Sequence, residues 1–282
     1  MSVVVTGATG HLGRLIVTSL LDRGVPAEQI VALGRDTSRL ADLADRGVTV
    51  RQADYNDADS LRAAFAGAEK LMFVSGTELG QRVAQARTVV AAAKDAGVEL
   101  VAYTSIPKAD TSSLTLAVEH RATEQEIEAS GLPYVFLRNS WYFENYLPQI
   151  PTYLEHGVIG AAGDGRISAA GRADYAEAAA AVLTTEGHAG KVYELGGAPF
   201  TMAELAGELS RQTGKDVTYT DLPVEKYVEV LVGTGMPEPF AAVLADGDRG
   251  AAAGELEVAG NDLERLIGRK PTTLAEAIRA AL

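Results

Sequence analysis

The chain has 282 residues and no cysteine, and its 25 Lys and Arg against 38 Asp and Glu give a formal net charge of −13 at pH 7. A sizeable core can therefore form without a metal or disulfide, and the dispersed basic residues in a negative field argue against nucleic acids and anionic membrane surfaces as partners. We therefore expect a small-molecule partner. The missing cysteines exclude disulfides, thiolate metal sites and a cysteine nucleophile.

The first predicted strand, Val3–Val5, runs directly into a glycine-rich turn and a predicted helix at Leu12–Arg23. Gly7, Gly10 and Gly13 stand three residues apart in this turn. A sharp turn, a close approach of backbone to a pyrophosphate and tight packing of helix on strand each exclude a Cβ atom, and the N–H groups at a helix start attract an anion. This context predicts a dinucleotide site rather than a turn without a ligand.

Further apolar runs in the first half alternate with helical stretches. The runs barely alternate between polar and apolar residues, which is typical of strands buried on both faces of a parallel sheet. Three of the helices end at a glycine that can adopt the left-handed conformation: Gly24, Gly97 and Gly131. The pattern predicts an α/β fold with a doubly wound Rossmann sheet. The predicted strands are Ile30–Leu33, Val48–Val50, Leu71–Val74, Leu100–Tyr103 and Tyr134–Leu137, and the helices are Ala58–Phe65, Gln81–Ala96 and Val118–Ser130.

The end of the second predicted strand indicates which dinucleotide binds. An NAD site usually places a carboxylate there on the ribose 2′-hydroxyl, about 20 residues after the glycines. Here Arg35 follows the strand, with Ser38 and Arg39 close behind, and an arginine fork suits a 2′-phosphate. We therefore expect NADP rather than NAD, although Asp36 could face the ribose and Arg35 could be a solvated loop charge. Asp54, after the third strand, either meets the adenine edge or caps the next helix.

The regular alternation of strands and helices loosens after residue 147. Prolines at 148 and 151 and a glycine-rich stretch at 157–171 precede predicted helices at Asp174–Thr185 and Met202–Thr213. We expect residues 1–147 to form the nucleotide-binding domain and residues 148–282 to form a smaller substrate lobe, with a strand at Val192–Leu195 that returns to the main sheet. The segment 241–254, rich in Ala, Gly and Asp, is either a mobile lid or an ordinary helix with glycine breaks.

Several short motifs carry a family resemblance. They are TGATGHLG, Arg35, ADYND, FVSG, YTS and, most specifically, EHRATE followed by GLPYVFLRNSWYFENY within residues 119–146. With them the chain resembles the NmrA-like branch of the atypical short-chain dehydrogenases, and within it the type 2 NAD(P)H:quinone oxidoreductases and the triphenylmethane dye reductases. The similarity spans nearly the whole chain, including VLTTEGHAGKVYEL and GMPEPF. It implies an NADPH-bound Rossmann domain, a smaller substrate lobe and an active site in the cleft between them.

The resemblance also assigns residues to the cofactor. Such a cleft agrees with the rule that ligands bind at the carboxyl ends of parallel strands. Thr104, assigned to the cofactor, and Ser105, assigned to the substrate, end the fifth strand and could instead only cap backbone groups. The pyrophosphate loop would comprise Gly7, Thr9, Gly10, His11, Leu12 and Gly13, with Arg35 on the 2′-phosphate and Asp54, Ser75 and Gly76 along the rest of the cofactor.

The segment around His120 departs from the usual short-chain dehydrogenase pattern. Most of these enzymes protonate a substrate oxygen with a tyrosine whose pKa is lowered by a lysine four residues later. If His120 takes the lysine position, as the resemblance suggests, Leu116 stands where the tyrosine would be. Reduction of a simple ketone forms a strongly basic alkoxide, and loss of the tyrosine that protonates it lowers the rate by about 10²–10⁴-fold. Reduction of a quinone instead forms a delocalised phenolate that water can protonate. The chain is therefore expected to reduce conjugated acceptors such as quinones or cationic dyes.

The resemblance gives the surrounding segment a direct role. His120 would hold the nicotinamide ribose and relay a proton, helped by the near-neutral pKa of histidine. Asn139 and Tyr142 would make the catalytic contacts to the acceptor. Flat apolar walls would come from Trp141, Phe143 and Tyr146.

Plainer alternatives exist for the same residues. His120 could share one solvated helix face with Glu119, Arg121 and Glu124. Any of the aromatic residues could be core filling between the lobes. The four histidines, at 11, 120, 156 and 188, lack the spacing of a metal site, so we expect no metal.

The favoured function is an NADPH-dependent oxidoreductase that transfers hydride to a quinone or similar conjugated acceptor. A regulator that senses NADP without turnover and a biosynthetic reductase for one specific metabolite are alternatives, because specificity lies in loops that sequence does not resolve. We expect a cytoplasmic protein, because no signal peptide precedes the first strand and no apolar run reaches the length of a membrane span. The sequence leaves the oligomeric state open, with a homodimer as one alternative.

Overall fold

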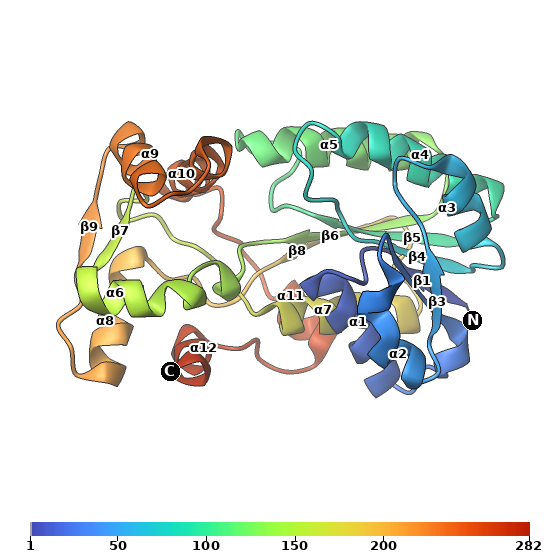
Figure 1. The fold of residues 1–282 in the computed structure, drawn as a ribbon, viewed down its shortest axis with the longest axis horizontal. Helices are drawn as coiled ribbons and strands as arrows, with labels where there is room; N and C mark the ends of the chain where they lie inside the picture. The colour runs from blue at the N-terminus through green and yellow to red at the C-terminus, as the bar shows by residue number, and fades with distance from the viewer. Residues whose placement is uncertain (1) are drawn as a thin grey trace.

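The computed structural model describes residues 2–282, and its main sheet occupies the centre and right of Figure 1. The strands of this sheet are β1 (Val3–Val5), β2 (Ile30–Gly34), β3 (Thr49–Gln52), β4 (Lys70–Phe73), β5 (Leu100–Ser105), β6 (Tyr134–Asn139) and β8 (Lys191–Leu195). All seven are parallel, in the order β3-β2-β1-β4-β5-β6-β8. The chain order reverses between β1 and β4, which confirms the predicted doubly wound Rossmann sheet.

Helices cover both faces of this sheet, as Figure 1 shows. Each face has its own buried core, one around Ile16 and Leu20 and the other around Phe65 and Tyr103. The first face carries α1 (His11–Asp22), α2 (Ala41–Asp45), α7 (Arg172–Thr184) and α11 (Asp262–Ile267), and the second carries α3 (Ala58–Phe65), α4 (Arg82–Asp95) and α5 (Thr115–Ala129). Short 3-10 helices span Ala27–Gln29, Thr37–Leu40, Phe143–Asn145 and Leu147–Gln149.

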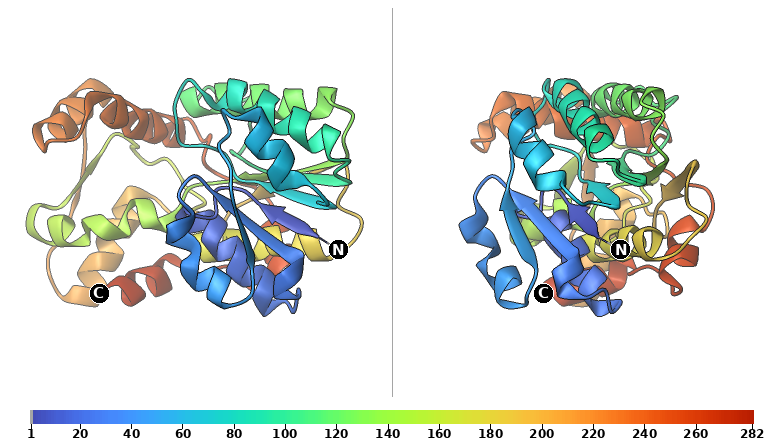
Figure 2. Two further views of the ribbon diagram at one scale, coloured as in Figure 1. Left: turned by 45° about the vertical axis from the view of Figure 1, so that its right-hand side comes forward. Right: turned by 90° about the vertical axis from the view of Figure 1, so that its right-hand side faces the viewer.

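A second lobe lies at the left of Figure 1 and is seen from two other directions in Figure 2. It has its own core, which includes Phe143, Phe200 and Leu209. Its elements are α6 (Ile150–His156), β7 (Val158–Gly160), α8 (Met202–Thr213), β9 (Tyr219–Asp221), α9 (Val224–Gly233), α10 (Glu238–Ala252) and α12 (Leu274–Ala281). Strands β7 and β9 pair in parallel as a separate two-stranded sheet. Within residues 2–282, no helix combines the length and the apolar character that crossing a membrane requires.

The chain returns to the main sheet after residue 148. The predicted strand Val192–Leu195 is present as β8 and pairs in parallel with β6. Helix α7 packs against α1, on the same side of the sheet as α11. The division of the chain at residues 147 and 148 stays a prediction, because elements on both sides of it build the main sheet and its helical layers.

Strands β5 and β6 each run two residues further than their apolar sequences predict. Strand β5 continues through Thr104 to Ser105, and β6 continues through Arg138 to Asn139. The apolar pattern ends at the first polar side chain, whereas the ladder of backbone pairing continues to Ser105 and Arg138. These polar side chains are therefore held on rigid strands at the carboxyl edge of the sheet.

The segment 241–254 is an ordinary helix over most of its length. Helix α10 runs through both Gly247 and Gly250 without a break. Asp246 accepts a hydrogen bond from the backbone N–H of Thr115 at 2.7 Å, and Glu255 accepts hydrogen bonds from residues 112–114. These contacts fasten the segment and the residue that follows it to the start of α5, which favours the ordinary helix over the mobile lid.

Candidate active site

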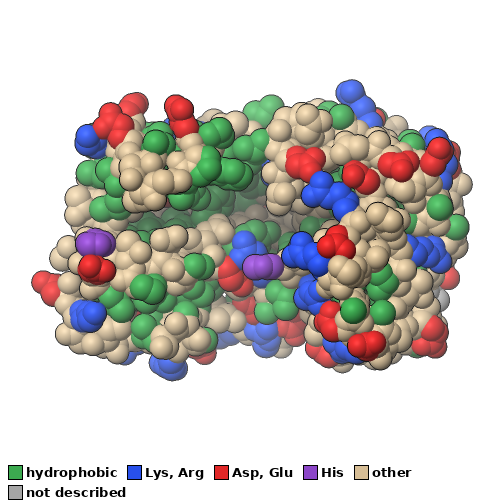
Figure 3. Space-filling view, viewed as in Figure 1, with side chains coloured by type: hydrophobic (Ala, Val, Ile, Leu, Met, Phe, Trp, Pro, Cys, Tyr) green, Lys and Arg blue, Asp and Glu red, His purple; other side chains and the backbone are tan. Residues whose placement is uncertain are grey.

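A cavity of about 660 Å³ lies at the carboxyl ends of β1, β4, β5 and β6 and extends to α10. This volume falls within the range of small-molecule sites, about 300–1,000 Å³. Figure 3 shows the surface hollowed beneath the α9–α10 pair, with hydrophobic side chains along the groove. The sequence-predicted residues that line the cavity are Gly7, Thr9, Gly10, His11, Leu12, Gly13, Arg35, Asp54, Ser75, Gly76, Ser105, His120, Asn139, Trp141 and Tyr142.

The glycine loop forms one end of the cavity and has the geometry of an anion cradle. Gly7 adopts a left-handed conformation with φ of +63°. A Cβ atom on Gly13 would lie only 2.3 Å from the carbonyl oxygen of Gly7, so the start of α1 packs directly on the loop. Gly10 caps α1 without a side-chain hydrogen bond, and the first turn of the helix carries no acidic residue. The loop therefore fits the pyrophosphate of a dinucleotide.

The predicted 2′-phosphate end of the cavity contains an ion pair that the sequence did not reveal. Arg35 donates to Glu78 at 2.7 Å, and the other oxygen of Glu78 accepts from Gln85 at 2.8 Å. The carboxylate of Asp36 accepts hydrogen bonds from the hydroxyl and the backbone N–H of Ser38, which lower its pKa. Asp36 thereby caps the short 3-10 helix Thr37–Leu40. Arg35 therefore lines this end of the cavity with Glu78 as its partner, and its contact with a 2′-phosphate stays a prediction.

Asp54 does not cap the next helix, because the N-cap of α3 is Asp57, and the contact of Asp54 with the adenine edge stays a prediction. Its carboxylate accepts hydrogen bonds from the backbone and side chain of Asn56 at 2.9 and 3.1 Å, so it stabilises the turn after β3. The same residue lines the cavity. The neighbouring Tyr55, which the sequence analysis did not single out, also lines it and donates to the carbonyl of Val74 at 2.7 Å.

Thr104 is not among the described residues that line the cavity, and its contacts are structural. Its hydroxyl accepts a hydrogen bond from the backbone N–H of Ser75 at 2.8 Å, which ties β5 to the loop after β4. Arg82 donates to the carbonyl of Gly76 at 2.7 Å and forms an ion pair with Glu119 at 3.2 Å. Thr104 and Arg82 therefore hold the loop that carries Ser75 and Gly76, and of these two only Arg82 lines the cavity.

His120 lies inside the protein, with 6% of its surface exposed, so the solvated-face alternative is wrong for this residue. Its Nδ1 atom is 2.8 Å from the hydroxyl of Tyr103 on β5. Burial, together with the nearby positive charge of Arg82, lowers the pKa of His120 to about 3. The expected near-neutral pKa is therefore wrong: at pH 7 the ring is neutral and can donate one hydrogen bond, but it does not carry a second proton.

This buried, neutral imidazole should make stability depend on pH. Because the folded pKa of about 3 lies below the unfolded value of about 6.5, the unfolded chain binds more protons between these values. The stabilisation is therefore complete above pH 6.5 and is lost as pH falls toward 3. Between pH 7 and pH 5 we expect the free energy of unfolding to fall by about 2 kcal/mol more in the wild type than in His120→Gln.

Urea unfolding of both proteins at the two pH values measures this difference. The comparison cancels the contribution of Asp248, whose pKa is raised to about 6 by burial and which acts in the opposite direction in both proteins. An identical pH dependence for the two proteins would contradict the neutral state of His120.

Two polar atoms in the middle of the cavity wall lack partners among the described residues. They are Oγ of Ser105 and Oδ1 of Asn139, and both are buried. A buried polar atom without a hydrogen bond costs about 1–3 kcal/mol, so a ligand with matching donors fits here. The amide nitrogen of Asn139 lies 3.5 Å from the hydroxyl of Tyr142, whose ring faces the guanidinium of Arg172 at 4.4 Å. Ser105, Asn139 and Tyr142 thus line the same cavity as His120.

The apolar end of the cavity includes residues that the sequence analysis missed. Phe240, Val243 and Leu244 of α10 line it, at positions i, i+3 and i+4 of one helix face. That periodicity was the available signal, but the glycines nearby favoured a lid or a broken helix. Leu116 also lines the cavity, one helical turn before His120, so an apolar side chain stands where the resemblance places the usual tyrosine.

Two of the predicted aromatic walls belong to the core of the second lobe. Phe143 stacks on Phe200 at 5.9 Å, and Tyr146 meets the same ring edge-on at 6.2 Å. Neither is among the described lining residues, whereas Trp141 is. The core-filling alternative therefore describes Phe143 and Tyr146, because the short 3-10 helix after Tyr142 turns them away from the cavity.

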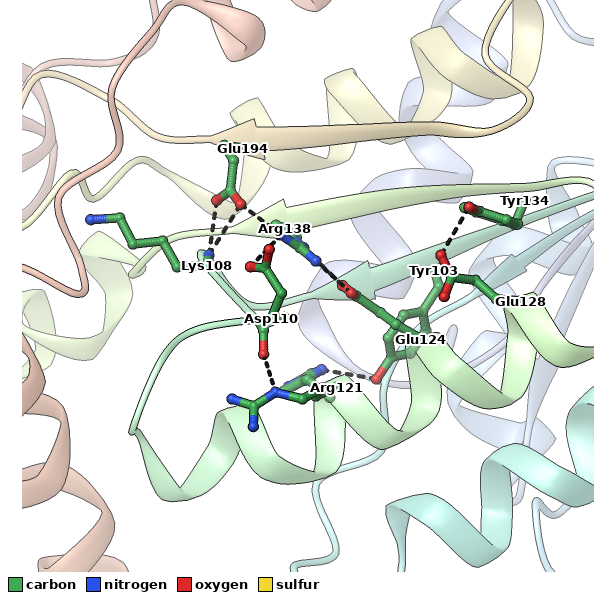
Figure 4. A network of polar contacts seen from close by, with 11 residues as sticks. Tyr103, Lys108, Asp110, Arg121, Glu124, Glu128, Tyr134, Arg138 and Glu194 are labelled. Atoms are coloured by element: carbon green, nitrogen blue, oxygen red, sulfur yellow. Dashed lines mark hydrogen bonds and ion pairs between the residues drawn. The ribbon is translucent and has the colours of Figure 1, made fainter.

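A buried charged network is centred on Arg138, the residue before Asn139 in β6, and is shown in Figure 4. Arg138 on β6 donates two hydrogen bonds to Glu124 on α5, at 3.0 and 2.7 Å. The same guanidinium contacts Glu194 on β8 and Asp110, each at 3.0 Å. Arg138 and Glu124 are only 8% and 5% exposed. This Arg138 network fastens α5 and β8 to β6 and so fixes the strand end that carries Asn139.

The described residues contain no group of three or more His, Asp or Glu that could hold a metal ion.

Comparisons of the sequence with characterised proteins give close relatives. The chain is 51% identical over 278 residues to quinone oxidoreductase 2 of Escherichia coli strain K12, covering 98% of this chain and 97% of that protein. It is 28% identical to the NAD(P)H azoreductase of Xenophilus azovorans, covering 99% and 97% of the two chains.

Solved structures give the same relationship. An NADPH complex of the NADPH-dependent quinone oxidoreductase from Escherichia coli superposes with a TM-score of 0.96 at 50% identity, covering 99% of each chain. The Citrobacter sp. triphenylmethane reductase in complex with NADP(H) gives a TM-score of 0.95 at 41% identity over the full length of both. The NmrA-like family model matches residues 1–278. The chain therefore belongs to the NmrA-like family.

Proposed function

We propose that this protein is an NADPH-dependent oxidoreductase that transfers hydride to a quinone or a similar conjugated acceptor. The observation that carries the proposal is a single cavity that joins the glycine loop to an apolar pocket beside Leu116 and a neutral His120. The similarity to quinone, azo and triphenylmethane reductases supports the same chemistry. A cytoplasmic location and a homodimer stay predictions within this proposal.

The residues that line the cavity indicate how NADPH would bind. When bound, NADPH supplies a hydride from its nicotinamide ring. The backbone of the loop at Gly7, Gly10 and Gly13 would hold the pyrophosphate, because its N–H groups and the start of α1 attract anions. Arg35 would bind the 2′-phosphate, and the segment after β4 that contains Ser75 would support the middle of the dinucleotide.

The residues around the acceptor would orient it and shield it from water, and would not protonate it. Ser105 and Asn139 have unpartnered buried oxygens that can receive hydrogen bonds from a carboxamide, and the hydroxyl of Ser105 can also donate to a carbonyl. His120 would donate a hydrogen bond from its protonated ring nitrogen. Trp141 and Leu116 would exclude water from one side of the acceptor. A quinone suits this arrangement because its reduced form is stabilised by delocalisation and can take its protons from solvent.

Steady-state oxidation of NADPH by the purified protein, with a panel of benzoquinones and naphthoquinones, tests the proposal directly. We expect turnover well above the uncatalysed rate with these acceptors and little or none with plain aliphatic ketones. Turnover no faster than background across the panel, in protein shown to bind NADPH, would leave a dinucleotide-binding protein without this activity.

Arg35 and Glu78 give a paired prediction on cofactor choice. Arg35→Ala should weaken NADPH binding by about 10- to 100-fold, the value of one charge-assisted contact, and leave NADH binding nearly unchanged. Glu78→Gln should instead tighten NADPH binding, because it removes the carboxylate that holds Arg35 at 2.7 Å. Nucleotide fluorescence titration measures the affinities of the wild type and of both variants for each dinucleotide, and equal losses for NADPH and NADH in Arg35→Ala would show that this residue does not face the 2′-phosphate.

A further inference from the structure

Helix α10 presents one continuous face to the apolar end of the cavity. Phe240, Val243 and Leu244 line it, and Gly247 follows on the same face at the next i+3 and i+4 spacing. Gly247 is buried, and the indole of Trp141 lies directly on it. A Cβ atom at residue 247 would stand 2.9 Å from Cζ2 of that ring, a distance that Cβ atoms essentially never adopt, and 3.0 Å from Cη2, which is tighter than most Cβ contacts.

The backbone of Trp141 cannot retreat from such a collision. Its carbonyl accepts hydrogen bonds from the N–H of Ala170 at 3.1 Å and from the hydroxyl of Tyr175 at 3.2 Å. The neighbouring Ser140 is bonded to the carbonyls of Leu195 and Leu256, at 2.8 and 3.0 Å. An added methyl group at residue 247 must therefore turn the indole, and the open space beside the indole is the cavity that it lines.

We propose that Gly247 is a positioning residue that sets the depth of the acceptor pocket by holding the indole of Trp141 back against α10. The inference rests on the proposed function and deepens it: a pocket whose depth depends on the indole distinguishes acceptors by size, so moving the indole should impair a two-ring naphthoquinone more than a single-ring benzoquinone. A glycine inside a helix is intrinsically unfavourable relative to alanine. At residue 247 the close approach of the indole requires it.

Two other helical glycines provide matched controls. Gly250 stands one turn later on α10, and a Cβ there would meet Cδ2 of Leu114 at 2.4 Å, yet Leu114 is not among the described lining residues. Gly207 on α8 is exposed and has no described heavy atom within 4 Å of its Cβ position. Gly250→Ala thus reports displacement of α10 without the indole, and Gly207→Ala reports the alanine substitution alone.

The experiment compares kcat/KM for 1,4-naphthoquinone with kcat/KM for 1,4-benzoquinone, together with the Kd for NADPH. In Gly247→Ala we expect the ratio to fall roughly tenfold, as for a pocket that loses room for part of a ring, with little change in the Kd for NADPH. Trp141 is the single tryptophan of the chain, so the emission maximum should shift in this variant. Gly207→Ala and Gly250→Ala should keep the wild-type ratio.

Rescue by Trp141→Phe provides the second arm, because phenylalanine lacks both Cζ2 and Cη2. In this background Gly247→Ala should leave the ratio unchanged relative to Trp141→Phe alone. If Gly247→Ala by itself does not fold, a folded double variant with that unchanged ratio supports the inference. A double variant that also fails to fold, or a tenfold effect that persists without the indole, overturns it.

The failure of the inference is distinct from the failure of the proposed function. A wild type that oxidises NADPH with quinones, beside a Gly247→Ala protein with an unchanged ratio, or a Gly250→Ala protein with the same fall in ratio, overturns the role of Gly247 alone. A wild type without quinone turnover removes the proposed function. In that case quenching of Trp141 emission by the two quinones gives their Kd ratio, and an equal ratio in wild type and Gly247→Ala overturns the pocket-depth inference as well.

Discussion

Gly13→Ala should weaken NADPH binding about 100-fold or more, the loss expected when several charge-assisted contacts are disturbed together. The new Cβ atom would lie 2.3 Å from the oxygen and 2.7 Å from the carbonyl carbon of Gly7, and 3.0 Å from Cα of Ala8. All three neighbours are backbone atoms, so no flexible side chain can move aside. The loop itself must shift, and with it the N–H groups that would hold the pyrophosphate.

Gly10→Ala is the matched comparison within the same loop. Its Cβ would meet only the oxygen of Gly7, at 3.3 Å, so a shift of a few tenths of an ångström suffices and the loss of affinity should be much smaller. Gly207→Ala should bind NADPH like the wild type. Isothermal calorimetry with each variant gives the order of the losses. Wild-type affinity in Gly13→Ala would mean that the dinucleotide does not use this loop.

Arg138→Met should destabilise the fold by about 3–5 kcal/mol, because it leaves Glu124 buried without its partner. Glu124 is 5% exposed and receives two hydrogen bonds from the guanidinium, at 3.0 and 2.7 Å. Glu194 keeps its contacts with the backbone N–H of Lys108, at 3.1 Å, so Glu124 bears most of the cost. Urea unfolding followed by circular dichroism measures the change in the free energy of unfolding.

Arg87→Met is the control, because Arg87 on α4 forms an exposed pair with Glu126 on α5, the helix that also carries Glu124. The exposed fractions of those side chains are 66% and 34%, and such a pair contributes at most about 1 kcal/mol. Adding Glu124→Leu to Arg138→Met should recover much of the lost stability by removing the unpaired carboxylate. A loss below 1 kcal/mol in Arg138→Met alone would contradict this account of the network.

The nucleotide-binding half was predictable because its signals are local. The spacing of Gly7, Gly10 and Gly13 after a strand predicts the dinucleotide loop without reference to any distant residue. The apolar runs likewise predict strands that are buried on both faces. Left-handed glycines at the predicted helix ends follow the same logic, with φ of 82° at Gly24 and 71° at Gly97. Each of these features depends on a few consecutive residues.

The parts that escaped prediction depend on residues far apart in the chain. The pKa of His120 is set by burial and by Arg82, and neither is visible in the sequence around it. In the sequence Glu124 resembles part of a polar helix face, and only the fold places Arg138 beside both Glu124 and Glu194. Gly247 looked like a break in a helix, and only the position of Trp141, more than a hundred residues earlier, explains it.

The late return of the chain to its main sheet has a consequence for synthesis. Ile16 and Leu20 of α1 are buried in one core with residues of α7, and β8 covers the outer side of β6. On the ribosome, the first 147 residues therefore emerge with a bare apolar helix face and an open strand edge. At about 5–20 residues per second, this state lasts for seconds before β8 appears. The nascent chain is then most exposed to aggregation, and a product truncated in this interval is a natural client for chaperones and proteases.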